Sequence, residues 1–262
     1  MRPNRLREKL NAGEPTLSTH IHTTSPSIVE ALGHTGIYDY YEFDAEYSAF
    51  DLHDLDNLCR AAELYDMGSM IKVDQIHQGF LAQRAIGAGF GSVLFTDCRS
   101  ADDVRECIRI ARPDTPEDHG LYGVASRRNA IMGYQDSVEY VEALRNIVVA
   151  LMIEKKSAVE SLEEILSVPG VDMIQWGPSD YSMSAGRAGD MSHPDIQAVG
   201  KKVFQTAMSM GVPPRAEISS PDDAKRYLDM GVRHFCIGAD IPILYGWWKE
   251  NGEALLKAMS GA

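Results

Sequence analysis

Basic residues are in short supply in this 262-residue sequence, which has 25 Lys and Arg against 38 Asp and Glu and a formal net charge of −13. A protein that binds nucleic acid needs a basic surface to neutralise the phosphates, so the composition argues against a nucleic-acid partner. Cysteines are also few, and none forms a Cys-x-x-Cys pair, which predicts reduced thiols in or near the core. They are Cys59, Cys98, Cys107 and Cys236.

Long apolar runs are lacking. No stretch approaches the roughly 20 residues that a membrane helix requires, and the charged N-terminus has no apolar segment of the kind found in signal peptides. We therefore expect a cytoplasmic protein without a membrane partner. A Gly-x-Gly-x-x-Gly motif directly after a first strand, the usual nucleotide signature of a doubly wound sheet, is also missing.

What the chain does contain is a regular alternation of short, β-rich apolar runs with longer segments of helical period. The predicted strands are Leu17–Thr23, Tyr38–Asp44, Ser69–Val73, Ser92–Phe95, Ile147–Glu154, Met173–Trp176, Val212–Ile218 and His234–Ile237. The predicted helices are Ser27–Leu32, Asp54–Asp66, Gln78–Ala88, Ala101–Ala111, Ala158–Leu166, Asp195–Met210 and Asp222–Met230. Glycines that can cap such helices are Gly36, Gly68, Gly87, Gly170, Gly211 and Gly231. Eight strands with helical intervals predict a single (β/α)8 TIM barrel domain, residues 1–262.

Acidic residues stand at the C-terminal ends of several predicted strands, where the βα loops of a barrel build the active site. Glu154 ends one nearly all-apolar run, and Asp180 follows the next predicted strand. A single carboxylate in such a place is usually a helix N-cap or the partner of a buried arginine. Two on neighbouring strands repel each other unless a cation lies between them, and hard divalent cations prefer carboxylate oxygens. The pair therefore indicates a divalent-metal site.

A Gly-Pro turn precedes Asp180. Gly177-Pro178-Ser179 follows a predicted strand, so its backbone N–H groups can bind a substrate carboxylate. An ordinary βα turn is the alternative.

The segment from Trp176 to Gly186, followed by His193-Pro194-Asp195, resembles the metal-binding segment of the HpcH/HpaI aldolase family, and Leu151–Glu154 resembles the strand that carries the other ligand. These are class II, metal-dependent pyruvate aldolases, among them 2,4-dihydroxyhept-2-ene-1,7-dioate aldolase and aldolases for 2-keto-3-deoxy sugar acids. The resemblance covers essentially the whole chain. It implies that Glu154 and Asp180 bind Mg²⁺, Mn²⁺ or Co²⁺, and that the segment Trp176-Gly177-Pro178-Ser179 holds a 2-oxo acid. It also implies a hexamer, a trimer of dimers, with the last helix exchanged between subunits.

Three positions depart from the acid–base residues of that family. In Asp44-Ala45-Glu46-Tyr47 the tyrosine stands where the family has a histidine tied to the acid–base step. Lys72 replaces an arginine that stabilises the enolate, and Ala85 replaces an aspartate. Tyrosine ionises near a pKa of roughly 10, against roughly 6.5 for histidine, so Tyr47 is a poor base at neutral pH.

Two histidines offer a replacement. His20 and His22 lie two residues apart, on one face of a predicted strand. We predict that one of them takes over proton transfer or that the pair recognises an acidic group of the substrate; an ordinary core or surface role is the alternative. Arg128, in a long predicted loop, is a candidate for binding a substrate carboxylate, and a solvated loop residue is its alternative.

The sequence thus predicts retro-aldol cleavage of a 2-oxo acid to a pyruvate-type enolate and an aldehyde. In this prediction the metal acts as a Lewis acid, Lys72 stabilises the enolate, and His20, His22, Tyr47 or a metal-bound water carries the proton, next to Asp44 and Glu46. Three alternatives stay open: a Schiff-base aldolase that uses Lys72, a related lyase or decarboxylase of a 2-oxo diacid, and a binding protein that kept the fold without turnover.

Overall fold

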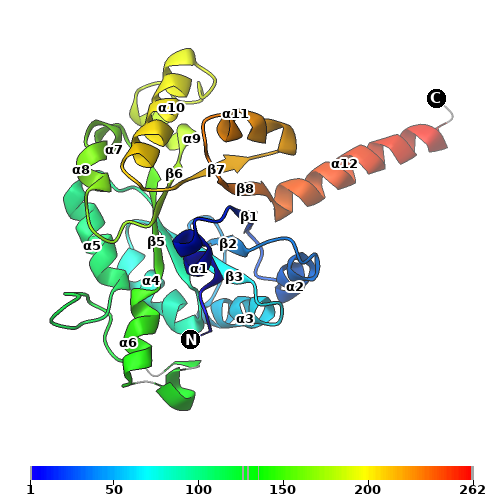
Figure 1. Cartoon of the computed structure of the whole chain (residues 1–262). Helices are drawn as coiled ribbons and strands as arrows, with labels where there is room; N and C mark the ends of the chain where they lie inside the picture. Colours follow the sequence, from blue (N-terminus) through cyan, green and yellow to red (C-terminus); the bar gives the residue numbers. More distant parts are fainter. Residues whose placement is uncertain (1, 126, 129, 135, 261–262) are drawn as a thin grey trace.

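A closed barrel of eight parallel strands, in the order β1 to β8, forms the centre of the molecule (Figure 1). The computed structural model describes residues 2–125, 127–128, 130–134 and 136–260. The strands are β1 (Thr16–Ile21), β2 (Tyr40–Asp44), β3 (Gly68–Val73), β4 (Ser92–Phe95), β5 (Val148–Ile153), β6 (Met173–Trp176), β7 (Pro214–Ile218) and β8 (His234–Ala239). The predicted TIM barrel is confirmed, and two of the predicted strands, β4 and β6, have the predicted bounds.

Helices surround the barrel in the order that a (β/α)8 fold requires. They are α1 (Arg5–Ala12), α2 (Pro26–His34), α3 (Leu52–Glu63), α4 (Gln78–Ala88), α5 (Ala101–Ala111), α6 (Val138–Arg145), α7 (Lys156–Glu160), α8 (Leu162–Leu166), α9 (Pro178–Ser184), α10 (Pro194–Ser209), α11 (Ala224–Leu228) and α12 (Asp240–Met259), with a π-helical turn at Ala130–Tyr134 and a 3-10 turn at Pro221–Asp223. The helix predicted for 158–166 is divided into α7 and α8, which meet at Ser161.

Four of the six glycines predicted to end helices take the left-handed backbone that this role requires; they are Gly36, Gly170, Gly211 and Gly231, with φ between 70° and 98°. The prediction is wrong for two. Gly87 lies inside α4, which ends one residue later and is capped by Gly89 at φ 126°, and Gly68 is the first residue of β3.

Side chains of each strand alternate between the barrel interior and the helices. Towards the N-terminal ends of the strands the interior is apolar, and Leu6 of α1 packs there against Tyr40, Met70 and Val148. The N-terminal helix therefore closes that end of the barrel. The opposite end, where the strands finish, carries the buried charged residues Asp44, Lys72 and Glu154.

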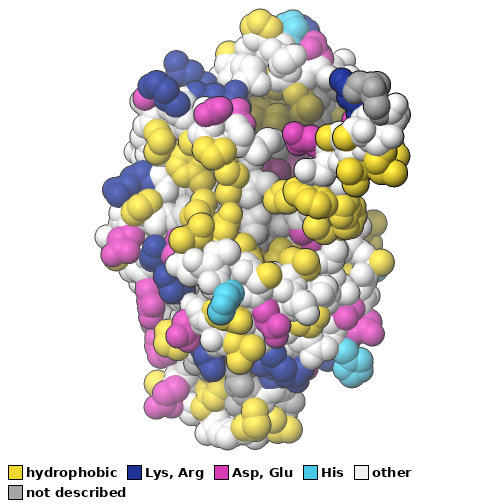
Figure 2. Space-filling view, turned by 90° about the vertical axis from the view of Figure 1, so that its right-hand side faces the viewer, with side chains coloured by type: hydrophobic (Ala, Val, Ile, Leu, Met, Phe, Trp, Pro, Cys, Tyr) yellow, Lys and Arg dark blue, Asp and Glu magenta, His cyan; other side chains and the backbone are white. Residues whose placement is uncertain are grey.

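The last helix, α12, projects away from the barrel (Figure 1). Asp240, its first residue, is its only buried residue within the described chain, whereas Tyr245, Trp247 and Trp248 are exposed. Figure 2 views the molecule from the side on which α12 projects, and hydrophobic side chains gather in several patches there. No helix in the described residues combines the length and the apolar character needed to cross a bilayer.

Candidate active site

Glu154 lies at the C-terminal end of β5 and is buried, with 5% of its surface exposed. Its Oε1 accepts a hydrogen bond from the backbone N–H of Asp97 at 2.8 Å. Its other oxygen faces Gly177, at the end of β6, so closely that a Cβ atom on Gly177 would lie 2.8 Å from Oε2. A glycine is therefore needed at position 177 to leave room for this carboxylate.

Asp180 comes from the first turn of α9, directly after Gly177. Its Oδ1 accepts a hydrogen bond from Lys155 Nζ at 2.8 Å, and the same ammonium group pairs with Asp97. Lys155 thus connects two carboxylates beside Glu154. Sequence reasoning did not single out Lys155 or Asp97, although Lys155 directly follows one predicted strand and Asp97 comes two residues after the end of another.

A divalent cation fits the acidic side chains at this end of β5 and β6. Burial raises the pKa of Glu154 to about 7, and the negative charge of Asp180 contributes to the rise even though a hydrogen bond from Asp97 opposes it. A bound cation would favour the ionised form of Glu154 in this partly dry site. Carboxylate oxygens are the ligand type that Mg²⁺ and Mn²⁺ prefer.

Lys72, on β3, points into the same end of the barrel and is almost fully buried. Its Nζ lies 2.8 Å from Glu46 Oε2 and 3.5 Å from Asp44 Oδ2, and 4.3 Å above the centre of the Tyr47 ring. Burial alone would lower the pKa of Lys72, but these carboxylates raise it above its ordinary value. Lys72 is therefore a fixed positive charge at neutral pH.

His22 follows β1 and lies between two carboxylates. Its Nδ1 is 3.3 Å from Asp240 Oδ1, and its Nε2 is 3.8 Å from Asp44 Oδ2. Asp240 also accepts hydrogen bonds from the backbone N–H groups of His22 and Thr23. The hydrogen bond to Asp240 raises the pKa of His22, against the effect of burial. With 28% of its side chain exposed, this imidazole is oriented and can be reached from solvent.

The interior below these groups contains a buried polar network. Arg215 on β7 pairs with Glu42 on β2, and its Nε donates to Gln175 Oε1 at 2.6 Å. Gln175 in turn donates to Glu217 Oε2 at 3.0 Å. Burial alone would raise the pKa of Glu42, but Arg215 lowers it to about 2. Sequence reasoning missed the pair of Arg215 and Glu42. The signal was a charged residue inside each of two predicted strands.

His20 belongs to this interior layer and not to the accessible end. It is buried, with 6% of its surface exposed, and its Nε2 lies 3.7 Å from Glu42 Oε1. Its ring centre lies 6.4 Å from that of His22. The two histidines are therefore neighbours, but His20 is buried beside Glu42 whereas His22 is partly exposed. Asp44, which lies near both, has its pKa raised to about 6, chiefly by burial.

Comparison with known proteins decides the family. The model of the HpcH/HpaI aldolase/citrate lyase family matches residues 18–244. The chain belongs to this family. It is 29% identical over 242 residues to the hydroxypyruvate/pyruvate aldolase of Paraburkholderia phytofirmans, and the aligned region covers 91% of this chain and 92% of that protein. It is 25% identical over 256 residues to the 5-keto-4-deoxy-D-glucarate aldolase of Klebsiella pneumoniae, covering 97% of this chain and 98% of that one.

A crystal structure of an HpcH/HpaI aldolase/citrate lyase family protein from Burkholderia cenocepacia superposes with a TM-score of 0.87 at 28% identity, covering 98% of this chain and 100% of that one. The HpcH/HpaI family is a family of lyases, and this chain is an enzyme of that family.

Within this HpcH/HpaI barrel, two residues predicted to bind substrate lie elsewhere. The side chain of Trp176 points outward because strand residues alternate, and its ring packs against Tyr181 and against Gly200 of α10. Arg128 pairs with Glu63 at 2.9 Å, near the C-terminal end of α3 and thus near the N-terminal ends of the strands. Its neighbours Ser126 and Asn129 lie outside the described residues.

Pro178, Ser179 and Tyr47 do lie at the C-terminal end of the barrel. Pro178 and Ser179 form the first turn of α9, and Ser179 Oγ contacts Met191 Sδ at 2.9 Å. Tyr47 follows β2 and is largely exposed, and its partial burial raises its pKa to about 12, which disfavours it as a base at neutral pH. Ala85 is buried in α4 and supplies no polar group.

Proposed function

We propose that this chain is a divalent-metal-dependent aldolase that makes or breaks the carbon–carbon bond between a pyruvate-type 2-oxo acid and an aldehyde. The observation that carries the proposal is the buried carboxylate of Glu154, packed against Gly177 and made harder to ionise by burial and by Asp180. Membership of a lyase family whose relatives include aldolases supports the same reaction class.

Glu154 and Asp180 are the proposed ligands of the metal, Mg²⁺ or Mn²⁺, with Co²⁺ as a further candidate. The ion supplies Lewis-acid polarisation of the 2-oxo group when it is bound. Lys155 Nζ lies 2.8 Å from Asp180 Oδ1, so an ammonium group already pairs with one of these carboxylates. Binding therefore requires the cation to compete with an ammonium group for the same carboxylate.

The start of α9 is the proposed site of the substrate carboxylate. The first N–H groups of a helix have no acceptor within the helix, and Gly177, Pro178 and Ser179 bring this terminus beside Glu154. The 2-oxo acid would then lie with its negative end on the backbone and its carbonyl towards the acidic pair.

His22 is the proposed base. It accepts the proton of the 4-hydroxyl group, the C3–C4 bond breaks, C4 leaves as the aldehyde carbonyl, and the electron pair of that bond moves into the enolate of the 2-oxo acid. Asp240 holds the imidazole and stabilises its protonated form. The positive charge of Lys72, kept in place by Glu46 and Asp44, stabilises the developing enolate oxygen.

A Schiff-base mechanism at Lys72 is opposed by the same charges. An amine attacks a carbonyl only when it is unprotonated, and the surrounding carboxylates raise the pKa of Lys72 above its ordinary value. Decarboxylation of a 2-oxo diacid is the remaining alternative, and the assay below distinguishes it by its products.

The test is a panel of aldehydes with pyruvate or hydroxypyruvate, run with Mg²⁺, Mn²⁺ or Co²⁺ and with EDTA. We expect aldol products with added metal, loss with EDTA, and loss in Glu154→Gln and Asp180→Asn. The matched control is Glu160→Gln, which changes an exposed carboxylate on α7. Full activity in EDTA, or in both ligand variants, contradicts the proposal. Release of CO₂ without an aldol product supports the decarboxylase.

We also propose that α12 packs on a second copy of the chain in a homo-oligomer, a hexamer by family resemblance. The support is its exposed apolar side chains, which are costly to leave in water; they are Ile241, Ile243, Tyr245, Trp247, Trp248, Leu255, Leu256 and Met259. Light scattering on Trp247→Lys/Trp248→Lys should give a smaller particle than the wild type. An unchanged mass in that variant contradicts the proposal.

A further inference from the structure

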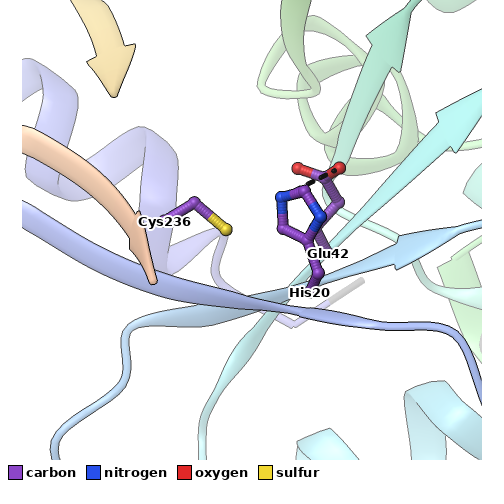
Figure 3. Close-up of side chains that lie close together, drawn as sticks. All are labelled: His20, Glu42 and Cys236. Atoms are coloured by element: carbon purple, nitrogen blue, oxygen red, sulfur yellow. Dashed lines mark ion pairs between the residues drawn. The ribbon is translucent and has the colours of Figure 1, made fainter. Parts of the chain in front are cut away.

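Three side chains from three strands converge inside the barrel (Figure 3). They are His20 on β1, Glu42 on β2 and Cys236 on β8, and one donor atom from each lies within 4.8 Å of the other two. All three residues are buried. They lie apart from the proposed ligands Glu154 and Asp180, which come from β5 and the start of α9.

Two polar atoms of this cluster lack a partner. His20 Nε2 and Glu42 Oε1 are buried and make no hydrogen bond to any residue that the structure describes. Nε2 lies 3.7 Å from Glu42 Oε1 and 4.0 Å from Glu217 Oε2. These distances are too long for hydrogen bonds. They are close to the roughly 3.3–3.8 Å between two ligand atoms of one tetrahedral ion with bonds of about 2.0–2.3 Å.

We propose that His20, Glu42 and Cys236, with Glu217 as fourth ligand, form a second cation site for a borderline-soft divalent ion of the Zn²⁺ type. An imidazole nitrogen, a thiolate and carboxylate oxygens are the donor set that Zn²⁺ accepts. The proposed site at Glu154 has oxygen ligands only and selects harder ions. The two sites therefore differ in the metals that they bind.

The charges around the cluster balance with a divalent ion. Binding releases to solvent the thiol proton of Cys236 and any proton held by the imidazole of His20, because both groups must be unprotonated to act as ligands. The ion and Arg215 then carry three positive charges, and Glu42, Glu217 and the thiolate carry three negative ones. Arg215 holds the other oxygen of Glu42 and so orients it towards the cluster, the usual role of a residue behind a metal ligand.

The position of the site suggests a structural role. The pairing of β1 with β8 shifts in register between Ser18 and His20, where the first and last strands close the barrel. An ion bound by His20, Glu42 and Cys236 would link β1, β2 and β8 across this irregular seam. Its binding should therefore raise the Tm of the protein.

The experiment is a Co²⁺ titration of the full chain carrying Glu154→Gln and Asp180→Asn, so that only the inner site remains. We expect one Co²⁺ per chain, an absorption band in the near ultraviolet from charge transfer between thiolate and Co²⁺, and displacement by Zn²⁺. Adding Cys236→Ser should abolish the band and weaken binding at least tenfold. The control is Cys59→Ser, which changes a buried cysteine on α3, outside the barrel, and should keep the band.

A second variant, His20→Gln, guards against misfolding of the serine variant, and circular dichroism checks both. No thiolate band with Cys236 intact, or an undiminished band in Cys236→Ser, overturns the inference. Because the ligands of the proposed catalytic metal are removed at the outset, this result is independent of whether the chain is a metal-dependent aldolase.

Discussion

Lys155 forms an ion pair with Asp180: its ammonium nitrogen lies 2.8 Å from Asp180 Oδ1. The same nitrogen also pairs with Asp97. The carboxylate expected to bind a metal is thus already neutralised by the chain itself. The ammonium group lowers the repulsion between Asp180 and Glu154, and a metal ion that binds Asp180 must compete with it.

Removing that competitor should strengthen metal binding. Lys155→Gln removes the ammonium group that competes with the metal ion for Asp180 and repels it. We expect the affinity for Mn²⁺ to rise about tenfold, which corresponds to about 1.4 kcal/mol of binding free energy. Isothermal titration calorimetry measures the change. Lys156→Gln, which removes an exposed lysine that pairs with Glu160, is the control. Weaker binding in Lys155→Gln would show instead that the lysine orients Asp180.

Gly177 should not tolerate a side chain. In Gly177→Ala the new Cβ would lie 2.7 Å from Glu154 Cβ and 2.8 Å from its Oε2, so the carboxylate must move. We expect kcat/KM to fall by about two orders of magnitude, the effect of a misplacement of about 1 Å, with the Tm changed little. The control is Gly79→Ala in α4, where the Cβ makes an ordinary contact at 3.7 Å with Ile110. Equal activity of the two variants contradicts the proposed place of Glu154.

His22 should control proton transfer. Replacing it by Gln should lower kcat by about 10²–10⁴ with little change in KM, the usual contribution of a general base. His53→Gln, on the exposed start of α3, should be neutral. A full rate in His22→Gln, measured with the best substrate pair of the panel, removes His22 from the mechanism.

The pH profile should depend on Asp240. The hydrogen bond to Asp240 raises the pKa of His22 above its ordinary 6.5, so the base becomes protonated, and the rate falls, as the pH drops through that raised value. In Asp240→Asn the pKa of His22 should decrease and the acidic limb should move to lower pH. NMR titration of the imidazole gives the pKa directly. If the acidic limb of the pH–rate profile lies at the same pH in Asp240→Asn as in the wild type, another residue is the base.

Lys72 should act as a charge and not as a nucleophile. Borohydride added with pyruvate should trap no adduct, because the carboxylates of Asp44 and Glu46 keep the amine protonated. Lys72→Met should lose about two orders of magnitude or more in kcat, since one preorganised charge at a developing oxyanion is worth that much. Mass spectrometry that finds a pyruvyl adduct on Lys72 establishes the Schiff-base mechanism.

Arg215 and Glu42 should be coupled in stability. With the inner site kept metal-free by chelator, Arg215→Met leaves a buried carboxylate without its partner and should lower the free energy of unfolding by about 3–5 kcal/mol. The double variant Arg215→Met/Glu42→Leu removes both charges and should recover most of that loss. Urea unfolding of the four proteins gives the coupling energy, and additive effects contradict the pairing.

The barrel was predictable from local pattern. Strands are short apolar runs with β-branched residues, helices have a period of 3.6 residues, and neither property depends on distant parts of the chain. The ends of β5 and β6 were therefore located to within one residue, and with them Glu154 and Asp180. The alternation that places Trp176 outside the barrel was available too, and applying it would have excluded that side chain from the site.

The partners of these residues were decided by the tertiary structure. His22 meets Asp240 from 218 positions away, and Arg215 meets Glu42 from 173. No periodicity records such contacts, because they arise only when the last strands close on the first. The sequence by itself determined which chemical groups stand at the strand ends. Closure of the barrel determined which carboxylate faces which cation or imidazole, because those pairings depend on distances that a linear pattern does not contain.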